Sequence, residues 1–387
     1  MKINILVGAR FQAKLLANFF QKNYIDCTIY TSSPPKNWQE ASLSGTKIIR
    51  FIPLFFKIIF KILKLRPSRK FREFDAILFD RLSSFFMRES DVLHGWATFS
   101  LYSAKKYKKK GKYFVLERAC PHVLYQEELL SQEAEILSTV YDKTSQDFVS
   151  RAIEEYTLAD KIIVPSMYSY DSFIERGVPE KKLEIVRLDA NFFPKNIDSK
   201  MQKKANFVVG TIGGNVLRKG FLYLVDAWQS LELKDAKLLL KTSVKELKNV
   251  PKIWDKIKDD DSIEIVGYFK NIEDFYKQCD VFCLSSIDDG FGMVVFEALA
   301  CAKPVIATKN VGASEMLLEG KTGFILENRD TVAIARSIKI FYDDRGLIKT
   351  MGANALEYYK QYQQGDNNYE SQMMKIYKGI ENELKKS

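Results

Sequence analysis

The stretch Ser285–Thr308, SSIDDGFGMVVFEALACAKPVIAT, places two carboxylates, Asp289 and Glu297, eight positions apart around an apolar run. The segment DVFCLSS, which ends at Ser285 and Ser286, has the composition of a buried strand. FGMVVFEALA is predicted to be the helix that follows. IDDG then becomes the loop at the carboxyl end of that strand. A short apolar strand joined to a helix in this way is typical of a parallel α/β sheet.

The same alternation of short strands and helices runs along the rest of the chain. INILVGA at the N-terminus is followed by a helix pattern near residues 11–22, and DVLHGW by another near residues 100–109. A polar segment, Pro194–Asn206, interrupts the alternation, which then restarts with FVVGTIG. We therefore expect an α/β protein with two doubly wound, Rossmann-like domains that face each other across a cleft.

The polar segment divides the chain into three expected parts. Residues 1–197 and 198–365 form the two expected domains, and residues 366–387 form a C-terminal helix that could pack back on the N-terminal domain. A chain of 387 residues is long enough for two hydrophobic cores. In open α/β sheets ligands bind beyond the carboxyl ends of the strands, so the cleft is the expected site.

Composition narrows the classes of partner. The formal net charge of +10 favours an anionic partner, which at this stage includes nucleic acid, an anionic membrane surface and a phosphorylated small molecule. The five cysteines form no CxxC pair, and the acidic run in Lys258–Ser262 reads as a loop, so neither a disulfide framework nor a metal site is expected. The N-terminal MKINILVGAR resembles a strand and not a signal peptide, which favours a cytosolic location.

Two glycines and a helix start favour a phosphate at the loop after the strand. Gly290 and Gly292 let the backbone approach a ligand closely. The N–H groups of Gly292, Met293 and Val294 lack partners within the helix and would point at the ligand, where a negative charge is stabilised. This end of the helix is therefore predicted to hold a phosphate group.

The two carboxylates would flank such a ligand. Glu297 lies more than a turn inside a helix that is otherwise apolar, and a buried carboxylate needs hydrogen-bond donors. Sugar or ribose hydroxyls are suitable donors, and Asp289 in the loop would face the other end of the same molecule. The spacing suits a nucleotide sugar, with a diphosphate between two hydroxylated ends. The alternative is that Asp289 caps the helix and Glu297 pairs with a lysine.

The segment Val266–Asp330 resembles the C-terminal half of family 4 glycosyltransferases, which have the GT-B fold. The family's hallmark is E-x7-E with GFG inside it, followed by EAxAxGxPVI; here the residues are Asp289-x7-Glu297 and EALACAKPVI. Gly213–Trp228, GGNVLRKGFLYLVDAW, is similar to the family's G-x-L-x-x-x-KG-x-x-x-L-x-x-A. Weaker matches are LERACPHVLYQEELLSQE and ADKIIVPSMYSYDSFIERGVPEKKLEIV, so the resemblance covers nearly the whole chain from about residue 90.

The resemblance implies a transferase that uses a nucleotide-sugar donor, UDP- or GDP-linked, retains its stereochemistry and needs no metal or other cofactor. It implies that Glu297 holds the ribose, that Asp289 supports the developing positive charge of the donor sugar, and that Lys219 contacts the diphosphate. Asp289 is shorter than the family's glutamate. Gly214 stands where many members have an arginine, and Arg218 could replace it.

The other donor-binding residues follow from the same resemblance. The nucleotide base usually rests on backbone groups after the strand IEIVGYF, at Gly267, Tyr268 and Phe269, and a loop near the diphosphate follows the first strand at Gly8. The complete expected set is Gly8, Gly213, Gly214, Arg218, Lys219, Gly267, Tyr268, Phe269, Asp289, Gly290, Phe291, Gly292, Met293, Val294 and Glu297.

The chain has only two histidines, His94 and His122, and both fall at strand ends of the expected N-terminal domain. A histidine titrates near neutrality and can move protons, and many family members have one in these loops near the donor sugar. A structural, hydrogen-bonded histidine is the alternative at each position. Glu117 and Arg118, in the same loop as His122, could be a buried ion pair or acceptor ligands. The candidate catalytic residues are Asp289, Lys219, His94 and His122.

Positive charge is concentrated in residues 41–72, which hold nine lysines and arginines and no acid. Arg50, Lys57, Lys61 and Lys64 would fall on one stripe of a helix that is otherwise apolar. The run is too short and too charged to span a membrane, and it fits a helix that lies on an anionic membrane surface. A core helix with a solvated lysine stripe is the alternative. No nucleic-acid motif appears, so no nucleic-acid partner is expected.

The residues together predict an enzyme that transfers a sugar from a nucleotide-sugar donor to a saccharide or lipid-linked acceptor. The acceptor would bind the N-terminal domain, at the cytoplasmic face of the cell membrane, in surface-polysaccharide or glycolipid biosynthesis. The substitutions at Asp289 and Gly214 leave a second hypothesis, a catalytically weak, donor-binding scaffold subunit of a glycosylation complex. A GT-B epimerase, which would convert the donor without an acceptor, is the third.

Overall fold

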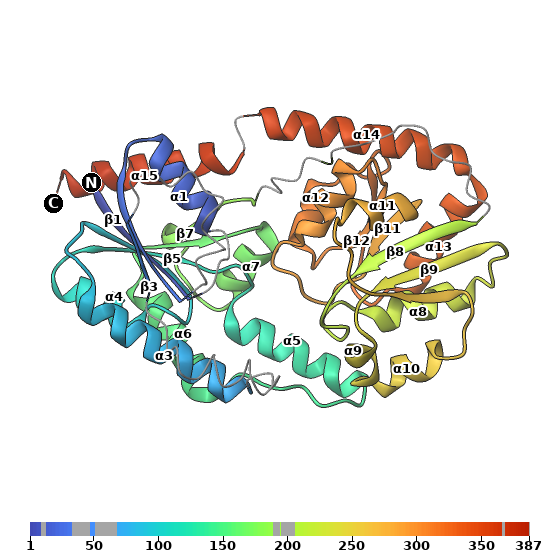
Figure 1. Ribbon diagram of the computed structural model, residues 1–387, viewed down its shortest axis with the longest axis horizontal. Coiled ribbons are helices and arrows are strands. Elements are labelled where there is room, and N and C mark those ends of the chain that lie inside the picture. The colour runs from blue at the N-terminus through green and yellow to red at the C-terminus, as the bar shows by residue number, and fades with distance from the viewer. Residues whose placement is uncertain are drawn as a thin grey trace.

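The computed structural model describes residues 1–8, 13–32, 47–50, 68–188, 194, 206–365 and 368–386. It contains two parallel sheets that lie in two bodies side by side (Figure 1), one of seven strands in the order β3-β2-β1-β4-β5-β6-β7 and one of six in the order β10-β9-β8-β11-β12-β13. We call the parts built on them the N-terminal and the C-terminal domain. The predicted class, α/β with two Rossmann-like domains, is confirmed.

The N-terminal domain is built on strands that are short and apolar, because a parallel sheet is covered by helices on both faces. Its strands are β1 (Lys2–Val7), β2 (Asp26–Thr31), β3 (Lys47–Arg50), β4 (Val92–Trp96), β5 (Tyr113–Glu117), β6 (Lys161–Val164) and β7 (Leu183–Ile185). Its helices are α1 (Ala13–Lys22), α3 (Arg69–Phe86), α4 (Leu101–Lys109), α5 (Val123–Ile136), α6 (Gln146–Leu158) and α7 (Met167–Glu175), with the 3-10 turn η2 (Glu180–Lys182).

The C-terminal domain repeats the pattern. Its strands are β8 (Phe207–Ile212), β9 (Ala236–Lys241), β10 (Ile263–Val266), β11 (Val281–Leu284), β12 (Val305–Thr308) and β13 (Gly323–Leu326). Its helices are α8 (Phe221–Ser230), α9 (Val244–Lys248), α10 (Pro251–Ile257), α11 (Glu273–Gln278), α12 (Met293–Ala300), α13 (Thr331–Asp343) and α14 (Arg345–Gln364), with the 3-10 turn η3 (Gly312–Met316). The opening stretch thus becomes the end of β11, a loop, α12 and β12.

The two domains share apolar packing. Leu130, Ala134 and Leu137, on and just after α5, are buried in the same cluster as residues of α8 in the C-terminal domain. The helix α5 therefore bridges the two bodies, as Figure 1 shows below the gap between the sheets. This packing fixes one domain against the other and sets which loops meet at their interface.

The last helix, α15 (Tyr369–Leu384), lies on the N-terminal domain, next to α1. Its Tyr377 meets Phe20 of α1 edge-on, with ring centroids 4.8 Å apart, and lies 6.3 Å from Phe19. The preceding helix, α14, runs along the C-terminal domain, so the chain crosses from one domain back to the other between them (Figure 1).

The prediction of a helix from Arg50 onward is wrong at its first residue. Arg50 ends strand β3, where it is paired with Thr31 of β2. The isoleucine pair in KIIR favours a strand, since β-branched residues fit a pleated sheet. Lys57, Lys61 and Lys64 lie outside the described residues. Among the helices that are described, none has the length and apolar character needed to cross a bilayer.

Candidate functional site

Lys219 and Asp289 form a buried ion pair between the loop that precedes α8 and the loop that follows β11. The Asp289 backbone is fixed because its N–H donates to the carbonyl of Asn310 at 2.9 Å. The carboxylate contacts the Lys219 Nζ, and the residue before α12 is Gly292 with no side-chain cap, so the alternative in which Asp289 caps the helix is wrong. The two residues that the motifs singled out separately are thus brought together at the carboxyl edge of the second sheet.

Gly213 and Gly214 differ in what they do for this pair. A Cβ on Gly213 would come within 2.5 Å of the Lys219 Cγ, so the glycine makes room for the lysine stem. A Cβ on Gly214 would meet open space. Gly220, with a φ of +61°, turns the chain into α8 directly after Lys219. The positions of Gly213 and Gly220, but not that of Gly214, therefore follow from the position of the lysine.

Arg218 adds a second cation to the same cluster. Its Nη1 lies 3.7 Å from Asp289 Oδ1 and 3.6 Å from Asp288 Oδ2, and it donates to the Asp288 carbonyl at 3.2 Å. Burial lowers the pKa of Arg218, but the neighbouring carboxylate charges outweigh burial, and the pKa is raised. The site thus holds two cations and two carboxylates.

Asp288 is a residue of this cluster that the sequence reasoning missed. It is fully buried and is reached from the N-terminal domain by Gln126, whose Nε2 donates to Oδ2 at 2.6 Å, and by Tyr168, whose hydroxyl donates to Oδ1 at 3.0 Å. Burial, together with the Asp288 charge, raises the pKa of Tyr168, which keeps the hydroxyl protonated as a donor. The doubled acid in IDDG was the available signal, because two adjacent carboxylates in a buried loop need separate sets of donors.

Gly290 lies against the N-terminal domain. Its carbonyl accepts hydrogen bonds from the hydroxyls of Ser166, at 2.7 Å, and Ser169, at 3.2 Å. A Cβ on Gly290 would collide with the carbonyl oxygen of Ala119. The prediction that this glycine admits a ligand is therefore corrected: it admits the backbone of the other domain.

Gly292 and its neighbours begin α12. Gly292 has a φ of +86°, a left-handed conformation that favours glycine, and it is the residue before the helix. Phe291 is buried and stacks on Phe296 with centroids 5.6 Å apart, whereas Met293 and Val294 are half-buried. The start of α12 thus has the helix geometry that the sequence predicted, with its first residues near Asp289.

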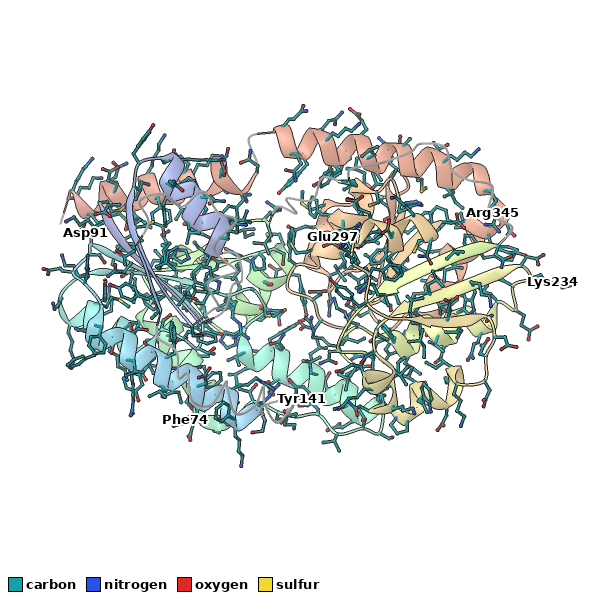
Figure 2. All side chains as sticks on the ribbon, in the orientation of Figure 1. Phe74, Asp91, Tyr141, Lys234, Glu297 and Arg345 are labelled. Atoms are coloured by element: carbon teal, nitrogen blue, oxygen red, sulfur yellow. The ribbon has the colours of Figure 1, made fainter. Side chains whose placement is uncertain are left out.

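Glu297 lies one turn into α12 and is half-buried (Figure 2). Its Oε2 accepts a hydrogen bond from the Tyr276 hydroxyl at 3.0 Å, so its partner is a tyrosine and not the lysine of the alternative interpretation. Burial raises the pKa of Glu297, and the Tyr276 hydrogen bond and the Lys241 charge act in the opposite direction. The carboxyl group is held in one orientation by α11, which carries Tyr276.

The residues expected near the nucleotide base follow β10. Tyr268 is 89% exposed, and Phe269 packs edge-on against Phe275 with centroids 5.7 Å apart. A Cβ on Gly267 would meet open space. At the first strand, Gly8 makes room for Phe99, with whose ring a Cβ would collide. The contacts of Phe269 and Gly8 are thus with the aromatic rings of Phe275 and Phe99, and not with the charged cluster around Lys219.

The two histidines have structural partners. His94 is fully buried in β4, with Nδ1 2.6 Å from the Tyr377 hydroxyl and Nε2 3.1 Å from Glu117 Oε2. His122 caps α5, where its Nδ1 accepts from the Leu124 N–H at 3.3 Å. Burial lowers the pKa of His122 to about 4, so the ring is neutral at pH 7. These contacts favour the structural alternative for both.

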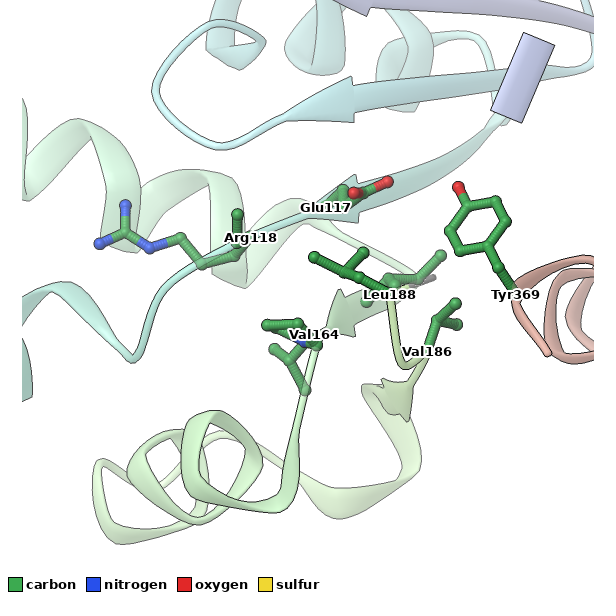
Figure 3. Close-up of a pocket in the computed structure, with 9 residues that line it drawn as sticks. Glu117, Arg118, Val164, Val186, Leu188 and Tyr369 are labelled. Atoms are coloured by element: carbon green, nitrogen blue, oxygen red, sulfur yellow. The ribbon is translucent and has the colours of Figure 1, made fainter. Parts of the chain in front are cut away.

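Glu117 and Arg118 do not pair with each other. They point in opposite directions (Figure 3), because alternate side chains of an extended chain face opposite sides. Glu117 meets His94, whereas Arg118 donates to the Pro121 carbonyl at 3.1 Å and to Gln126 Oε1 at 3.3 Å. Arg118 thereby orients the amide that binds Asp288.

A narrow pocket lies at the carboxyl edge of β5 and β6, under the start of α15 (Figure 3). It is mostly apolar, with the Glu117 carboxylate and the Tyr369 ring on one side. Its lining residues are Glu117, Arg118, Ala119, Ile163, Val164, Pro165, Val186, Leu188 and Tyr369. Within the described part of the chain, no three His, Cys, Asp or Glu side chains are grouped in a way that could hold a metal ion.

The sequence of the C-terminal half matches a known family. Residues 193–358 match the glycosyl transferases group 1 family. The chain is 31% identical over 152 residues to the capsular polysaccharide biosynthesis glycosyltransferase CapM of Staphylococcus aureus, which covers 38% of this chain and 40% of that protein. It is 31% identical over 123 residues to the N-acetyl-alpha-D-glucosaminyl L-malate synthase of Bacillus anthracis, covering 32% of each. These matches span less than half the length of either relative.

The similarity in structure extends over the whole chain. Sucrose-phosphate synthase from Thermosynechococcus elongatus superimposes with a TM-score of 0.72 at 18% identity, covering 100% of both chains. Anabaena HepE in complex with UDP superimposes with a TM-score of 0.68 at 18% identity, covering 99% of this chain and 100% of that one. The protein therefore has the GT-B fold, and residues 193–358 are similar in sequence to the group 1 glycosyl transferases.

Proposed function

We propose that the protein is a glycosyltransferase that moves a sugar from a nucleotide-sugar donor to a saccharide or lipid-linked acceptor. The observation that carries the proposal is the cluster of the buried Lys219 and Asp289 with the half-buried Arg218, which lies at the carboxyl edge of the second sheet and against the N-terminal domain. Ligands of open α/β sheets bind at this edge. The match of residues 193–358 to the glycosyl transferases supports the same conclusion.

The cluster supplies what departure of a nucleoside diphosphate requires. Lys219 and Arg218 would stabilise the negative charge that develops on the leaving diphosphate, and they are already oriented by carboxylates. Asp289 would support the positive charge on the sugar. Glu297, oriented by Tyr276, would accept hydrogen bonds from the ribose hydroxyls. In this scheme the two cations and the start of α12 take the place of a metal, and the donor's stereochemistry is retained.

The names of the similar proteins support a setting for the reaction. The Staphylococcus aureus relative is named for capsular polysaccharide biosynthesis, a Rhizobium meliloti relative for lipopolysaccharide core biosynthesis, and HepE was solved with UDP. We therefore propose a UDP- or GDP-linked donor and a role in surface-polysaccharide or glycolipid assembly. The protein would act as a peripheral protein at the cytoplasmic face of the membrane, as the basic, apolar sequence after Arg50 indicates.

The test is the thermal stability of the purified protein with a panel of nucleoside diphosphates and their sugar conjugates. A ligand at about 100 times its dissociation constant stabilises the folded state by ~2.7 kcal/mol, which a melting curve resolves. We expect one nucleotide to raise the melting temperature and one of its conjugates to raise it further. If no nucleotide raises it, the donor site is not functional and the proposal is wrong.

A further inference from the structure

The helix α3 carries acidic side chains on its buried side and phenylalanines on its exposed side. Helices at a protein surface normally bury their apolar face and expose their polar one. In α3 the buried face carries Glu73, Asp80 and Ser83 beside the apolar Ala76 and Phe79. Phe74 and Phe85 are 53% and 77% exposed, and Figure 2 shows Phe74 on the outer side of the helix.

The buried acids of α3 have a structural purpose. Asp80 accepts from the Tyr102 N–H at 2.7 Å and pairs with Arg151. Glu73 accepts from the Ser145 hydroxyl at 2.6 Å. These bonds join α3 to the starts of α4 and α6, which accounts for the acids on the inner face. They do not account for the phenylalanines outside, and a group of exposed apolar side chains on one face marks an interaction surface.

The outer phenylalanines lie on one side of the helix and are accompanied by cations. Phe74 and Phe85 are eleven positions apart, which at 3.6 residues per turn places them on the same side, with Arg81 between them. Lys106 of the neighbouring α4 donates to the Ser84 carbonyl at 2.6 Å, directly beside Phe85. The apolar side chains are therefore flanked by positive charge.

The neighbouring helix increases that charge. Leu101–Lys112, which comprises α4 and the turn after it, holds six lysines and no acid, and α3 packs against α4. Three of these lysines pair with acids of neighbouring elements: Lys105 with Glu154, Lys108 with Asp160 and Lys112 with Asp91. Lys109 and Lys110 are both exposed. Two acids accompany them on the α3 side, the half-buried Asp75 and the exposed Glu89. Phenylalanines bordered by an excess of lysines match the two components of a membrane surface, an apolar interior and anionic headgroups.

We propose that the outer face of α3, together with the lysines of α4, is the surface that docks on an anionic lipid bilayer. This α3–α4 surface deepens the peripheral-membrane part of the proposed function, on which it rests, and its evidence is independent of residues 50–64. Phe74 and Phe85 enter the boundary between headgroups and acyl chains, while Lys106, Lys109 and Lys110 contact the anionic headgroups.

The test is flotation of the full-length protein with vesicles, without donor or acceptor. One set of vesicles is phosphatidylcholine, and the other is equal parts of phosphatidylcholine and phosphatidylglycerol. The wild type is expected to float with the anionic set. The double variant Lys109→Gln, Lys110→Gln is expected to lower the partition coefficient by about 30-fold, the effect of two cations near an anionic surface. The double variant Phe74→Gln, Phe85→Gln is expected to lower it by at least as much.

Matched controls lie on the C-terminal domain. Val332→Gln changes an exposed apolar residue, and Lys245→Gln an exposed lysine; neither is expected to change flotation. Flotation that is unchanged in the α3 and α4 variants, or reduced equally in the controls, overturns the proposal. So does a wild-type dimer that the phenylalanine substitutions convert to a monomer, since a second copy would then cover the surface. Nucleotide-induced stabilisation, measured on the same variants, shows separately whether the donor site is intact.

Discussion

At the scale of single residues, the site is defined by buried side chains of opposite charge that pair with each other. Lys219 and Asp289 are each 8% exposed, and either charge alone would be costly at such a place. Each therefore holds the other in position before a ligand binds. A leaving diphosphate would meet cations that need little reorganisation, which is the condition under which fixed charges contribute most to catalysis.

Replacing Lys219 by alanine is expected to lower turnover by about 100- to 1,000-fold, the effect of removing one stabiliser of developing charge. The measurement is release of nucleoside diphosphate from the donor that the thermal panel identifies. Lys219→Arg keeps the charge and is expected to retain more activity than the alanine variant. Lys237→Ala, near the amino end of β9, is the control. Turnover that is unchanged in a folded Lys219→Ala variant would remove Lys219 from the mechanism.

At the scale of elements, the start of α4 depends on two acids from neighbouring helices. Glu155 of α6 accepts from the N–H of Ser100 at 2.8 Å and from that of Thr98, and Asp80 of α3 accepts from the following turn. Arg151 lies between the two carboxylates. These acids take the place of a capping side chain, because Ser100 precedes the helix without one.

The free energy of unfolding is expected to depend on pH through Glu155. Burial raises its pKa to about 7, although Arg151 and the two N–H groups oppose that shift and Asp80 adds to it. The folded state then binds a proton more tightly than the unfolded state does. The stability from this group is complete below about pH 4.5 and is lost as the pH rises through about 7.

Glu155→Gln removes this titration. Between about pH 5 and about pH 8, we expect the melting temperature of the wild type to fall relative to that of the variant. The corresponding loss in the free energy of unfolding is roughly 1.4 kcal/mol for each unit by which folding raises the pKa of Glu155. Glu154→Gln is the matched control, because Glu154 is an exposed neighbour that pairs with Lys105. A difference between wild type and Glu155→Gln that stays constant with pH would contradict the prediction.

The sequence predicted elements better than it predicted contacts. Strands such as β1 and β11 follow from short buried apolar runs, and the helix after Gly292 follows from its glycine and the apolar run. The strand at Arg50 was not predicted because KIIR, with two apolar residues, is too short for its periodicity to distinguish a strand from a helix. The partners of Asp288 could not be predicted, since Gln126 is 162 positions away and only the tertiary fold brings the two together. The same holds for the choice of His94, rather than Arg118, as the partner of Glu117.

At the scale of the whole molecule, the domains are joined by polar contacts that meet at the site. Gln126 and Tyr168 of one domain bind the carboxylate of Asp288 in the other, and Ser166 binds the Gly290 carbonyl. Arg187 pairs with Glu315 at 2.7 Å nearby. The loop that carries Asp289 is therefore held from both sides, so the arrangement of the domains and that of the charged cluster are coupled.

Tyr168→Phe is expected to lower the free energy of unfolding by about 1.5–3 kcal/mol, because it removes a hydrogen bond to a buried charge. Chemical denaturation measures the change. Tyr170→Phe, on the same helix, is the matched control: its hydroxyl donates to Glu180 at an exposed position, and its loss is expected to have little effect. Equal effects of the two substitutions would show that the contact with Asp288 does not hold the domains together.

The position of α15 has a consequence for the order in which the protein matures during synthesis. The ribosome makes β1, α1 and β4 before the C-terminal domain, yet Phe20 and His94 are covered by Tyr377, which emerges only after that domain. The N-terminal domain therefore cannot finish its packing while the C-terminal domain is being translated. A nascent chain that stalls before residue 369 would leave an aromatic surface open to chaperones and proteases, so the first-made domain is completed only after the C-terminal domain has been translated.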